Sequence, residues 1–219
     1  MTALVYTQAE LQTSNREGRR KAIRAAAMTL FSQNGYDRTT LKDIADVVGL
    51  THPALYYYYK SKNDLLYDTV VTTLRHLVEK VEAVPPRPPA ERLKRIAKAQ
   101  VMVQLEVRGF IPLTDSVLFG PLSKAGLFSD EQTEILAALQ RRLTAAYRKE
   151  IEAGCKAGVF SVESVAASTF SVLGTVSYVV YWYREKGALD REQTADLVAQ
   201  FCLSALSGAS ALGSEPPSL

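Results

Sequence analysis

The sequence predicts an all-α fold, with a small three-helix domain at the N-terminus and a larger helical domain after it. Two observations support this prediction. Apolar residues recur at helical spacing along most of the 219 residues. In addition, residues 39–65, TTLKDIADVVGLTHPALYYYYKSKNDL, contain two short helical segments joined by a glycine, followed at once by the start of a third. This second pattern is typical of a helix-turn-helix motif.

The chain begins with a polar segment, residues 1–15, that shows no periodicity, and we expect a flexible arm there. A helix is predicted over residues 16–33, because its apolar residues share one face and Gly35 ends it. Its first turns carry four basic residues, which the helix dipole disfavours at this end: Arg16, Arg19, Arg20 and Lys21. They form either an ordinary solvated face or a strip that follows a DNA backbone. We expect the second, because the unfavourable placement needs compensation.

Capping residues define the next two helices. Thr40 is a suitable N-cap, and Asp43 stands three residues on as its capping-box partner. Gly49 ends this helix, since glycine tolerates a positive φ. Thr51 caps the following helix, predicted over residues 53–59, with a proline in its first turn where a missing N–H costs nothing.

Four consecutive tyrosines, residues 56–59, fill the second of these helices. Adjacent side chains on a helix point to all sides, so at least two of the four must face outward. An exposed phenol suits a phosphate oxygen or a base edge, and Lys60 and Lys62 stand beside the run to neutralise phosphate charge. The alternative is a packed tyrosine core next to a solvated lysine pair. Ser61 then caps a third helix, with Asp64 at its N3 position.

The basic excess of the chain is confined to this part. The whole sequence has 26 Lys and Arg against 23 Asp and Glu, a formal net charge of +3. Up to Leu65 there are nine basic and six acidic residues, so the same excess of three is already present there. Local positive charge at a helix-turn-helix is what a phosphate backbone requires. The pattern therefore indicates double-stranded DNA as a partner.

The stretch GLTHPALYYYYKSKNDLL resembles the signature of the tetracycline-repressor (TetR) family, in which a Leu-Tyr pair and further aromatic residues precede Ser-Lys-x-x-Leu. The upstream stretch AAAMTLFSQNGYDRTTLKDIA is similar to the family's first helix, its Gly-Tyr turn and its second helix. The match covers the first third of the chain. The resemblance implies a DNA-binding transcriptional regulator, a repressor that binds a palindromic operator as a homodimer and is released by a small hydrophobic effector.

The resemblance also implies which residues contact DNA. They are Thr40, Lys42, Thr51, His52, Pro53, Tyr56, Tyr57, Tyr58 and Lys62. Phosphate contacts are expected from Thr40, Tyr58 and Lys62, and base reading or groove packing from Thr51, His52 and Tyr57. Family members often have glycine or a small residue where this chain has Pro53, whose apolar surface we expect to press on a thymine methyl group.

We place the DNA-binding domain at residues 16–66, the ligand-binding and dimerisation domain at 67–209, and a flexible tail at 210–219. The third helix is predicted to continue as a connector until the proline-rich segment 85–89 stops it. Further helices are predicted over residues 90–108, 129–157, 164–183 and 191–206, with a short segment at 114–124.

Residues 164–183 contain no charged side chain, and such a run is long enough to span a bilayer. Its many Ser and Thr residues and its amphipathic neighbours argue against insertion, so we expect no membrane partner. An apolar helix is otherwise buried on all sides, here against its own core and a second copy of the chain. Its predicted companion surface lies on the last helix and comprises Ala195, Leu197, Val198, Phe201, Cys202 and Leu206. This pair resembles the dimer interface of the TetR family.

A pocket for the effector is expected among the middle helices, lined by apolar and aromatic side chains. The candidates, each of which could instead be plain core, are Val101, Met102, Leu105, Phe110, Leu118, Phe119, Tyr147, Phe170, Tyr178 and Tyr181. Residues 181–184, Tyr-Trp-Tyr-Arg, resemble a motif in family members that answer to fatty acids, steroid-derived acids or acyl-CoA thioesters. A cationic amphipathic drug is the competing effector, although few acidic residues stand among the candidates.

The sequence contains few residues of the kinds that catalytic sites use. Its two histidines, His52 and His76, offer neither a metal site nor a base for a nucleophile, so we expect no enzyme activity, no metal and no cofactor. Cys155 and Cys202 are interpreted as small buried residues, with a thiol sensor as the alternative. No signal sequence is recognisable, and a cytoplasmic location is expected. The competing function is an all-helical small-molecule-binding or membrane-associated protein without DNA binding.

Overall fold

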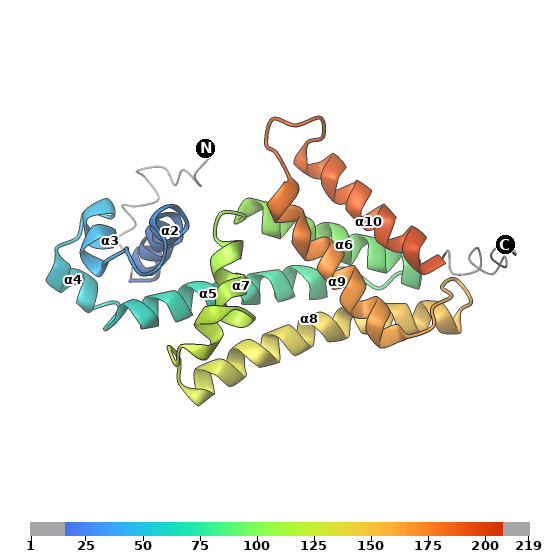
Figure 1. Ribbon diagram of the computed structural model, residues 1–219, viewed down its shortest axis with the longest axis horizontal. Helices are drawn as coiled ribbons and strands as arrows, with labels where there is room; N and C mark the ends of the chain where they lie inside the picture. The colour runs from blue at the N-terminus through green and yellow to red at the C-terminus, as the bar shows by residue number, and fades with distance from the viewer. Residues whose placement is uncertain (1–15, 208–219) are drawn as a thin grey trace, which may run out of the picture. The chain divides into compact units, whose positions relative to one another are not determined.

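The computed structural model describes residues 16–207, and every regular element in that range is a helix (Figure 1). The elements are α2 (Arg16–Asn34), α3 (Leu41–Val47), α4 (His52–Tyr56), α5 (Lys62–Glu82), α6 (Pro89–Glu106), α7 (Ile111–Leu118), the 3-10 helix η1 (Pro121–Lys124), α8 (Asp130–Lys156), α9 (Val165–Trp182) and α10 (Arg191–Ser207). The predicted all-α class is therefore confirmed. The predicted N-terminal arm and C-terminal tail lie outside the described residues.

The chain divides into two compact units. Unit 1 comprises residues up to 75 together with 106–138, and unit 2 comprises residues 76–105 together with those from 139 onward. Helices α5, α6 and α8 contribute residues to both units, α6 through its last residue alone. This division follows packing, so α7, η1 and the first part of α8 group with the N-terminal helices. The functional boundary that we place at residue 66 stays a prediction.

The core of unit 1 forms where α2, α3, α4 and the first half of α5 bury their apolar faces. Ile23, Ile44, Leu55 and Leu65 are fully buried. Thr39, in the turn before α3, is buried as well, and its hydroxyl donates to the carbonyl of Gly35 at 2.8 Å. The turn that joins α2 to α3 is thus fixed by side-chain as well as backbone bonds.

The segment after α6 is more helical than the sequence indicated. Helix α6 ends at Glu106, two residues before the predicted end, and α7 begins at Ile111, three residues before the predicted short segment. Pro112 occupies the first turn of α7, where proline is tolerated. Phe110, just before this helix, is buried and acts as its N-cap residue without a side-chain cap.

Helix α8 begins and ends as its sequence indicated. Ser129 Oγ accepts a hydrogen bond from the Gln132 backbone N–H at 3.2 Å, which satisfies one of the free donors of the first turn. Gly158 follows the helix with φ 70°. Within its last turn, a Cβ added to Gly154 would lie only 2.0 Å from the ring of Phe160, so the absent side chain lets Phe160 fold back onto α8.

The core of unit 2 combines apolar packing with polar ties between helices. Arg92 of α6 forms an ion pair with Glu150 of α8, and both side chains are largely buried. On the surface, Lys98 of α6 pairs with Glu192 at 2.6 Å and with Asp196 at 2.9 Å, both on α10. Exposed pairs of this kind contribute little on their own. The main stabilisation comes from the buried apolar faces of α6, α8, α9 and α10.

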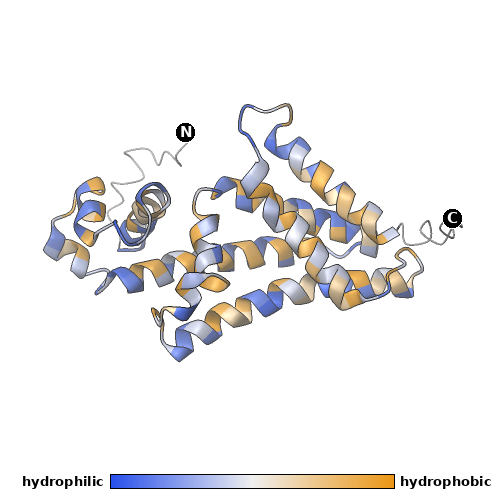
Figure 2. Ribbon diagram, viewed as in Figure 1, coloured by the Kyte–Doolittle hydropathy of each residue, from blue (hydrophilic) through white to orange (hydrophobic). Residues whose placement is uncertain are grey.

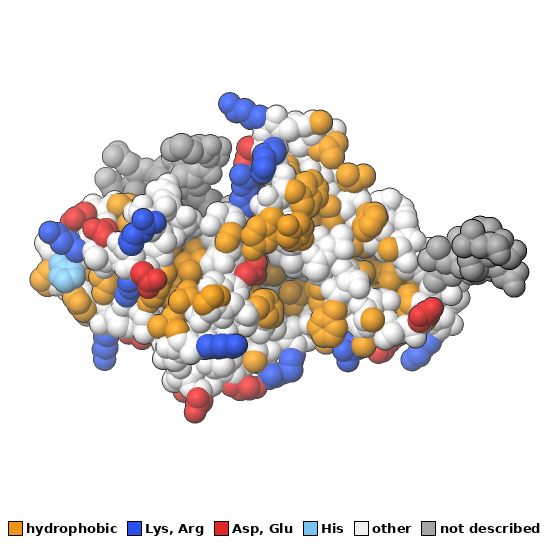
Figure 3. Space-filling model, in the orientation of Figure 1, with side chains coloured by type: hydrophobic (Ala, Val, Ile, Leu, Met, Phe, Trp, Pro, Cys, Tyr) orange, Lys and Arg blue, Asp and Glu red, His pale blue; other side chains and the backbone are white. Residues whose placement is uncertain are grey.

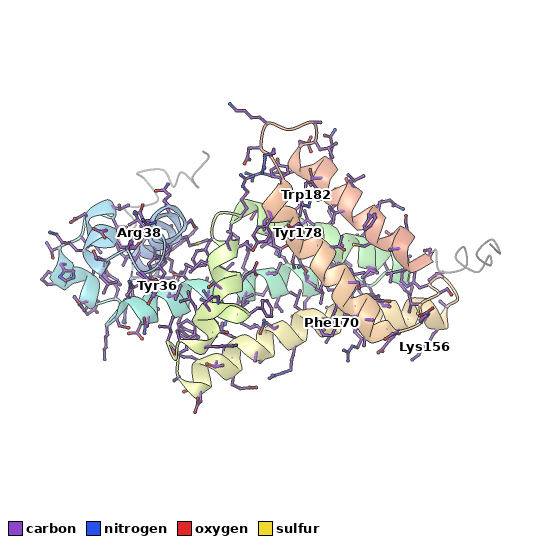
Figure 4. The ribbon with its side chains drawn as sticks, viewed as in Figure 1. Tyr36, Arg38, Lys156, Phe170, Tyr178 and Trp182 are labelled. Carbon is purple, nitrogen blue, oxygen red and sulfur yellow. The ribbon has the colours of Figure 1, made fainter. Side chains whose placement is uncertain are left out.

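Helix α9 has no charged side chain, and its ribbon in Figure 2 is pale to orange. One face, including Val172, Val176 and Val179, is buried in unit 2 against a core to which α10 also contributes. The opposite face is exposed in the single chain, as Phe170 and Tyr178 show (Figure 4). Within the described range, α9 is also the one helix long and apolar enough to cross a bilayer by length and composition, with a mean hydropathy of 1.3, a property that core helices share.

Candidate nucleic-acid interface

The start of α3 is held by a reciprocal capping box. The Asp43 backbone N–H donates to Thr40 Oγ at 3.2 Å, while Asp43 Oδ2 accepts from the Thr40 backbone N–H at 2.8 Å. The bond from the Thr40 backbone lowers the pKa of Asp43 and keeps its carboxylate ionised, which also suits the positive end of the helix dipole. The predicted cap is confirmed, and it fixes the first turn of α3.

A tight turn links α3 to α4. Gly49 has φ 66°, a conformation that side-chain-bearing residues rarely adopt, and the Leu50 backbone N–H closes the turn on the Ala45 carbonyl at 2.9 Å. Thr51 then caps α4, because its Oγ accepts from the Ala54 backbone N–H at 3.3 Å. Pro53 lies in the first turn, as predicted.

The predicted length of the second helix was wrong. Residues 53–59 were expected to be helical, whereas α4 ends at Tyr56. The backbone N–H groups of Tyr58 and Tyr59 both donate to the Leu55 carbonyl, at 2.9 and 3.1 Å, so the chain leaves the helix through a closed turn. Tyr59, which follows this turn, is buried and hydrogen-bonds to Asp68 of α5.

The four tyrosines divide between surface and core. Tyr57 is 69% exposed and Tyr56 is also exposed, Tyr58 is half-buried, and Tyr59 is only 3% exposed. The expectation that at least two face outward is confirmed. The exposed rings are ordered by their neighbours: Tyr56 packs edge-on against His52 with ring centroids 4.9 Å apart, and Tyr57 against Tyr58 at 5.3 Å.

Tyr59 belongs to a partly buried charge cluster that the sequence did not reveal. Its Oη lies 2.5 Å from Asp68 Oδ2, and the same oxygen accepts from Arg20 and Arg24, each at 3.0 Å. Burial alone would raise the pKa of Asp68, but the bonds from Tyr59 and Arg24 outweigh it and leave that pKa below its ordinary value. The cluster ties α2, the end of the tyrosine run and α5 together.

This cluster changes the interpretation of the basic strip on α2. Arg20 was expected to follow the DNA backbone, but its guanidinium is bound to Asp68 and stacks over the Tyr59 ring at 4.8 Å. Arg16 lies over the exposed Tyr57 ring at 5.4 Å. Arg20 therefore stabilises the domain, and Arg16 is the member of the strip that stands beside an exposed tyrosine.

Lys62 is oriented by the turn between α2 and α3. Its Nζ donates to the carbonyls of Tyr36 at 2.9 Å and Asp37 at 3.3 Å and lies 4.3 Å from the centroid of the Tyr36 ring. Tyr36 is itself fixed by a hydrogen bond to Asn63. The ammonium group of Lys62 thus already links α5 to this turn. A phosphate, as predicted, would be a further partner of the same group.

The nine predicted DNA contacts all lie between the start of α3 and the first residue of α5, within unit 1. Seven are exposed: Thr40, Lys42, Thr51, His52, Pro53, Tyr56 and Tyr57. Tyr58 and Lys62 are half-buried. The structure thus places short polar and aromatic side chains at the ends of two helices that pack on each other. Their contacts with DNA stay a prediction.

The predicted effector residues differ in burial, and their role in binding an effector stays a prediction. Val101, Leu105, Phe110 and Tyr147 are buried, and Met102 and Leu118 are half-buried. The others are exposed: Phe119, Phe170, Tyr178 and Tyr181. Phe110, Leu118 and Phe119 belong to unit 1 and the remaining seven to unit 2. The sequence analysis did not single out the polar residues Gln100, Gln104 and Ser177 of unit 2. The two glutamines could have been noticed, because they stand one turn apart in an apolar stripe.

The two cysteines are free thiols. Cys202 is buried, and burial raises its pKa to about 11, so it is a poor nucleophile at neutral pH. Cys155 is half-buried. Over residues 16–207 no cluster of three or more His, Cys, Asp or Glu side chains could hold a metal ion.

Two capped short helices, a glycine turn between them and exposed tyrosines at the end of the second define a helix-turn-helix motif at residues 40–57 of unit 1. Proteins of this class bind DNA by laying the second helix in the major groove. Two family models match this chain: "Bacterial regulatory proteins, tetR family" over residues 23–68 and "Tetracyclin repressor-like, C-terminal domain" over residues 86–206. The chain belongs to the TetR family of DNA-binding transcriptional regulators.

Individual relatives agree with this assignment. The HTH-type transcriptional repressor KstR2 of Rhodococcus jostii is 28% identical over 193 residues, which are 88% of this chain and 91% of the relative. The solved structure of the TetR family regulator PfmR from Thermus thermophilus is 27% identical, covers 84% of this chain and 97% of its own, and has a TM-score of 0.73. AibR, solved with isovaleryl coenzyme A and operator DNA, is 21% identical over 86% of this chain and 98% of its own (TM-score 0.69), a likeness of fold alone.

Proposed function

We propose that this chain is a homodimeric transcriptional repressor that binds a palindromic operator and leaves it when a hydrophobic small molecule binds. The observation that carries the proposal is the exposure of α4, a short helix that packs on the capped helix α3. Thr51 and Pro53 are exposed at its start and Tyr57 directly after its last residue, in a family of DNA-binding regulators. The name of the Rhodococcus relative supports repression rather than activation. Such a regulator acts in the cytoplasm.

A second copy is required because a single helix of five residues reaches too few base pairs for useful specificity. The surface that suits a second copy lies on α9 and α10. Large apolar side chains stand exposed along both helices, and Figure 3 shows apolar side chains gathered on this face. They are Phe170, Tyr178, Tyr181, Trp182, Leu197 and Phe201. Exposed apolar patches of this kind mark interaction sites in soluble proteins.

Two aromatic side chains on this face already pack against each other. Tyr178 and Tyr181 stack with ring centroids 5.2 Å apart. The buried members of α10, among them Ala195, Val198 and Cys202, serve the core of unit 2 rather than the surface. Of the residues that we predicted as a companion surface, Leu197 and Phe201 are thus the ones available to a second copy.

For the effector, we propose a fatty acid, a steroid-derived acid or an acyl-CoA. The Tyr181–Arg184 resemblance supports this class, and AibR shows that the fold accommodates both an acyl-CoA and operator DNA. The effector would change the separation of the two recognition helices, so that they no longer fit successive grooves.

The experiment that tests this proposal measures operator release. Purified full-length protein is mixed with its selected operator, and the dissociation constant is measured at fixed salt while palmitoyl-CoA, palmitate or cholate is added. We expect a dimer by sedimentation and at least a tenfold weaker affinity with one of the three. If the protein is a monomer and its operator affinity does not change with any of the three compounds, both the dimer and the effector class are overturned.

A further inference from the structure

Four polar side chains from three helices meet inside unit 2. They are Gln100 and Gln104 of α6, Tyr147 of α8 and Ser177 of α9. Tyr147 Oη donates to Gln100 Oε1 at 2.8 Å, and Gln100 Nε2 donates to Ser177 Oγ at 3.3 Å. Gln104 Nε2 reaches the same Oγ only at 3.5 Å. Three of the four side chains are buried and Ser177 is half-buried.

The two hydrogen bonds of Gln100 set its orientation. Tyr147 is fully buried, and burial raises its pKa well above 10, so the phenol keeps its proton and donates it. That proton identifies the Gln100 oxygen as the acceptor, and the amide nitrogen of Gln100 must then face Ser177. Gln100 is therefore a structural residue that ties α6 to α8 and α9.

Gln104 is different, although it stands on the same face of α6 one turn later. Its Oε1 is fully buried and has no hydrogen-bond partner among the described residues, and the whole residue is only 5% exposed. Burying an unmatched amide oxygen costs free energy that a leucine at this position would not cost. A position used only for packing would therefore not favour glutamine.

The surroundings of Gln104 restrict the chemistry of a partner. The four side chains of the cluster are all neutral, so a buried carboxylate would find no cation among them. The Gln104 amide can also turn by half a rotation, which would offer an N–H instead of an oxygen. A hydroxyl or a carboxamide group can both donate and accept, so it fits either orientation.

We propose that Gln104, together with Ser177, binds an uncharged hydroxyl or carboxamide group of the effector inside unit 2. This inference rests on the proposed function, because it requires a small molecule to enter the helical domain. It narrows the proposed effector class. An acyl-CoA, whose pantetheine arm carries carboxamides, or a hydroxylated steroid acid fits this site, whereas a simple fatty acid, whose only polar group is a carboxylate, does not. The rest of such a ligand would lie among apolar side chains of the same helices, such as Val101 and Val176.

The first measurement compares two leucine variants without any ligand. Gln100→Leu breaks two hydrogen bonds and leaves Tyr147 without its acceptor, so we expect the midpoint of thermal unfolding, Tm, to fall by about 3 °C or more. Gln104→Leu removes the unmatched oxygen together with one long hydrogen bond of 3.5 Å, so its Tm should equal or exceed that of the wild type. A fall in Tm for Gln104→Leu as large as for Gln100→Leu would show that Gln104 serves the core, through a bound water, and would overturn the proposal.

The second measurement titrates three probes of equal chain length into the full-length protein by calorimetry at pH 8: n-decanamide, 1-decanol and decanoate. The two neutral probes should bind the wild type at least tenfold more tightly than decanoate, and at least tenfold more tightly than they bind Gln104→Leu. Equal binding of decanoate, equal binding to the variant, or no binding of either neutral probe would each contradict the proposal.

Operator binding is measured on the same protein samples, so that the two failures can be told apart. Probe binding that depends on Gln104, in a protein that binds no operator, would reject the repressor function and leave the polar site standing. If the protein binds its operator but Gln104→Leu does not change the affinity for the probes, the polar site is rejected and the repressor function is retained.

Discussion

Tyr59 donates its phenol hydrogen to Asp68 across 2.5 Å, and this bond joins the last residue of the tyrosine run to helix α5. Arg20 lies over the Tyr59 ring and binds the same carboxylate oxygen. The exposed tyrosines just before Tyr59 are therefore anchored to the scaffold at one end. A recognition segment of this length needs such an anchor, because five helical residues are too few to be stable alone.

Removing the phenol hydroxyl of Tyr59 tests this anchor. Tyr59→Phe keeps the ring and deletes a hydrogen bond to a charged group, so the free energy of unfolding should fall by about 1–3 kcal/mol. Urea unfolding followed by circular dichroism measures the change. The exposed Tyr57→Phe is the matched control and should lie within about 0.5 kcal/mol of the wild type. Equal effects of the two substitutions would contradict the anchor.

The Asp68 carboxylate should make stability depend on pH. Because its pKa in the folded protein lies below the ordinary value of 3.8, its contribution is present above that pH and is lost as the pH falls through the folded value. Asp68→Asn should therefore differ most from the wild type near neutral pH, and the difference should shrink below pH 3.8. The measurement is the unfolding free energy of both proteins across this range. A constant difference would refute the linkage.

Lys42 provides a test of phosphate contact. It is exposed at the start of α3, next to the capping box. If it neutralises one phosphate in each protomer, Lys42→Ala should weaken binding to all sequences alike and reduce the slope of log affinity against log salt by about 1 per lysine. Fluorescence anisotropy at several salt concentrations gives the slope. Lys149→Ala, an exposed lysine of α8, is the control, and an equal change in both variants would exclude the contact.

Phe201 tests the dimer surface. It is 61% exposed on α10, and a charge placed there would be buried against the second copy. Phe201→Glu should convert the dimer to a monomer at micromolar concentration in sedimentation velocity, without loss of helix by circular dichroism. Val159→Glu, in the exposed loop after α8, should remain dimeric. A Phe201→Glu protein that stays dimeric would place the interface elsewhere.

The sequence was sufficient for features that depend on neighbouring residues. The capping of α3 by Thr40 and Asp43 and the positive φ of Gly49 follow from local chemistry, and the structure confirms both. It also confirms a break in the proline-rich segment, although Pro89 is already the first residue of α6. The contact of the buried Tyr59 with Asp68, after the early end of α4, could not be predicted in this way. That contact joins residues nine positions apart across a turn, and no periodicity reveals it.

The candidate sites divide in the same way. The exposed face of unit 1 follows from motif spacing, because consecutive residues carry it. The polar cluster of Gln100, Tyr147 and Ser177 draws on three helices separated by up to 77 positions, so it appears only after folding. An apolar stripe in sequence also cannot separate core residues such as Tyr147 from surface residues such as Phe170.

The most direct test of the account is a binding selection of the full-length protein on random duplex DNA. Wild type, Tyr57→Ala, Pro53→Ala and the distant control Lys80→Ala are selected in parallel. We predict a palindromic consensus for the wild type and the control, loss or weakening of that consensus with Tyr57→Ala, and relaxed preference at one position of each half-site with Pro53→Ala. The account would be contradicted if the wild type enriched no sequence at low salt. It would also be contradicted if neither Tyr57→Ala nor Pro53→Ala changed the consensus.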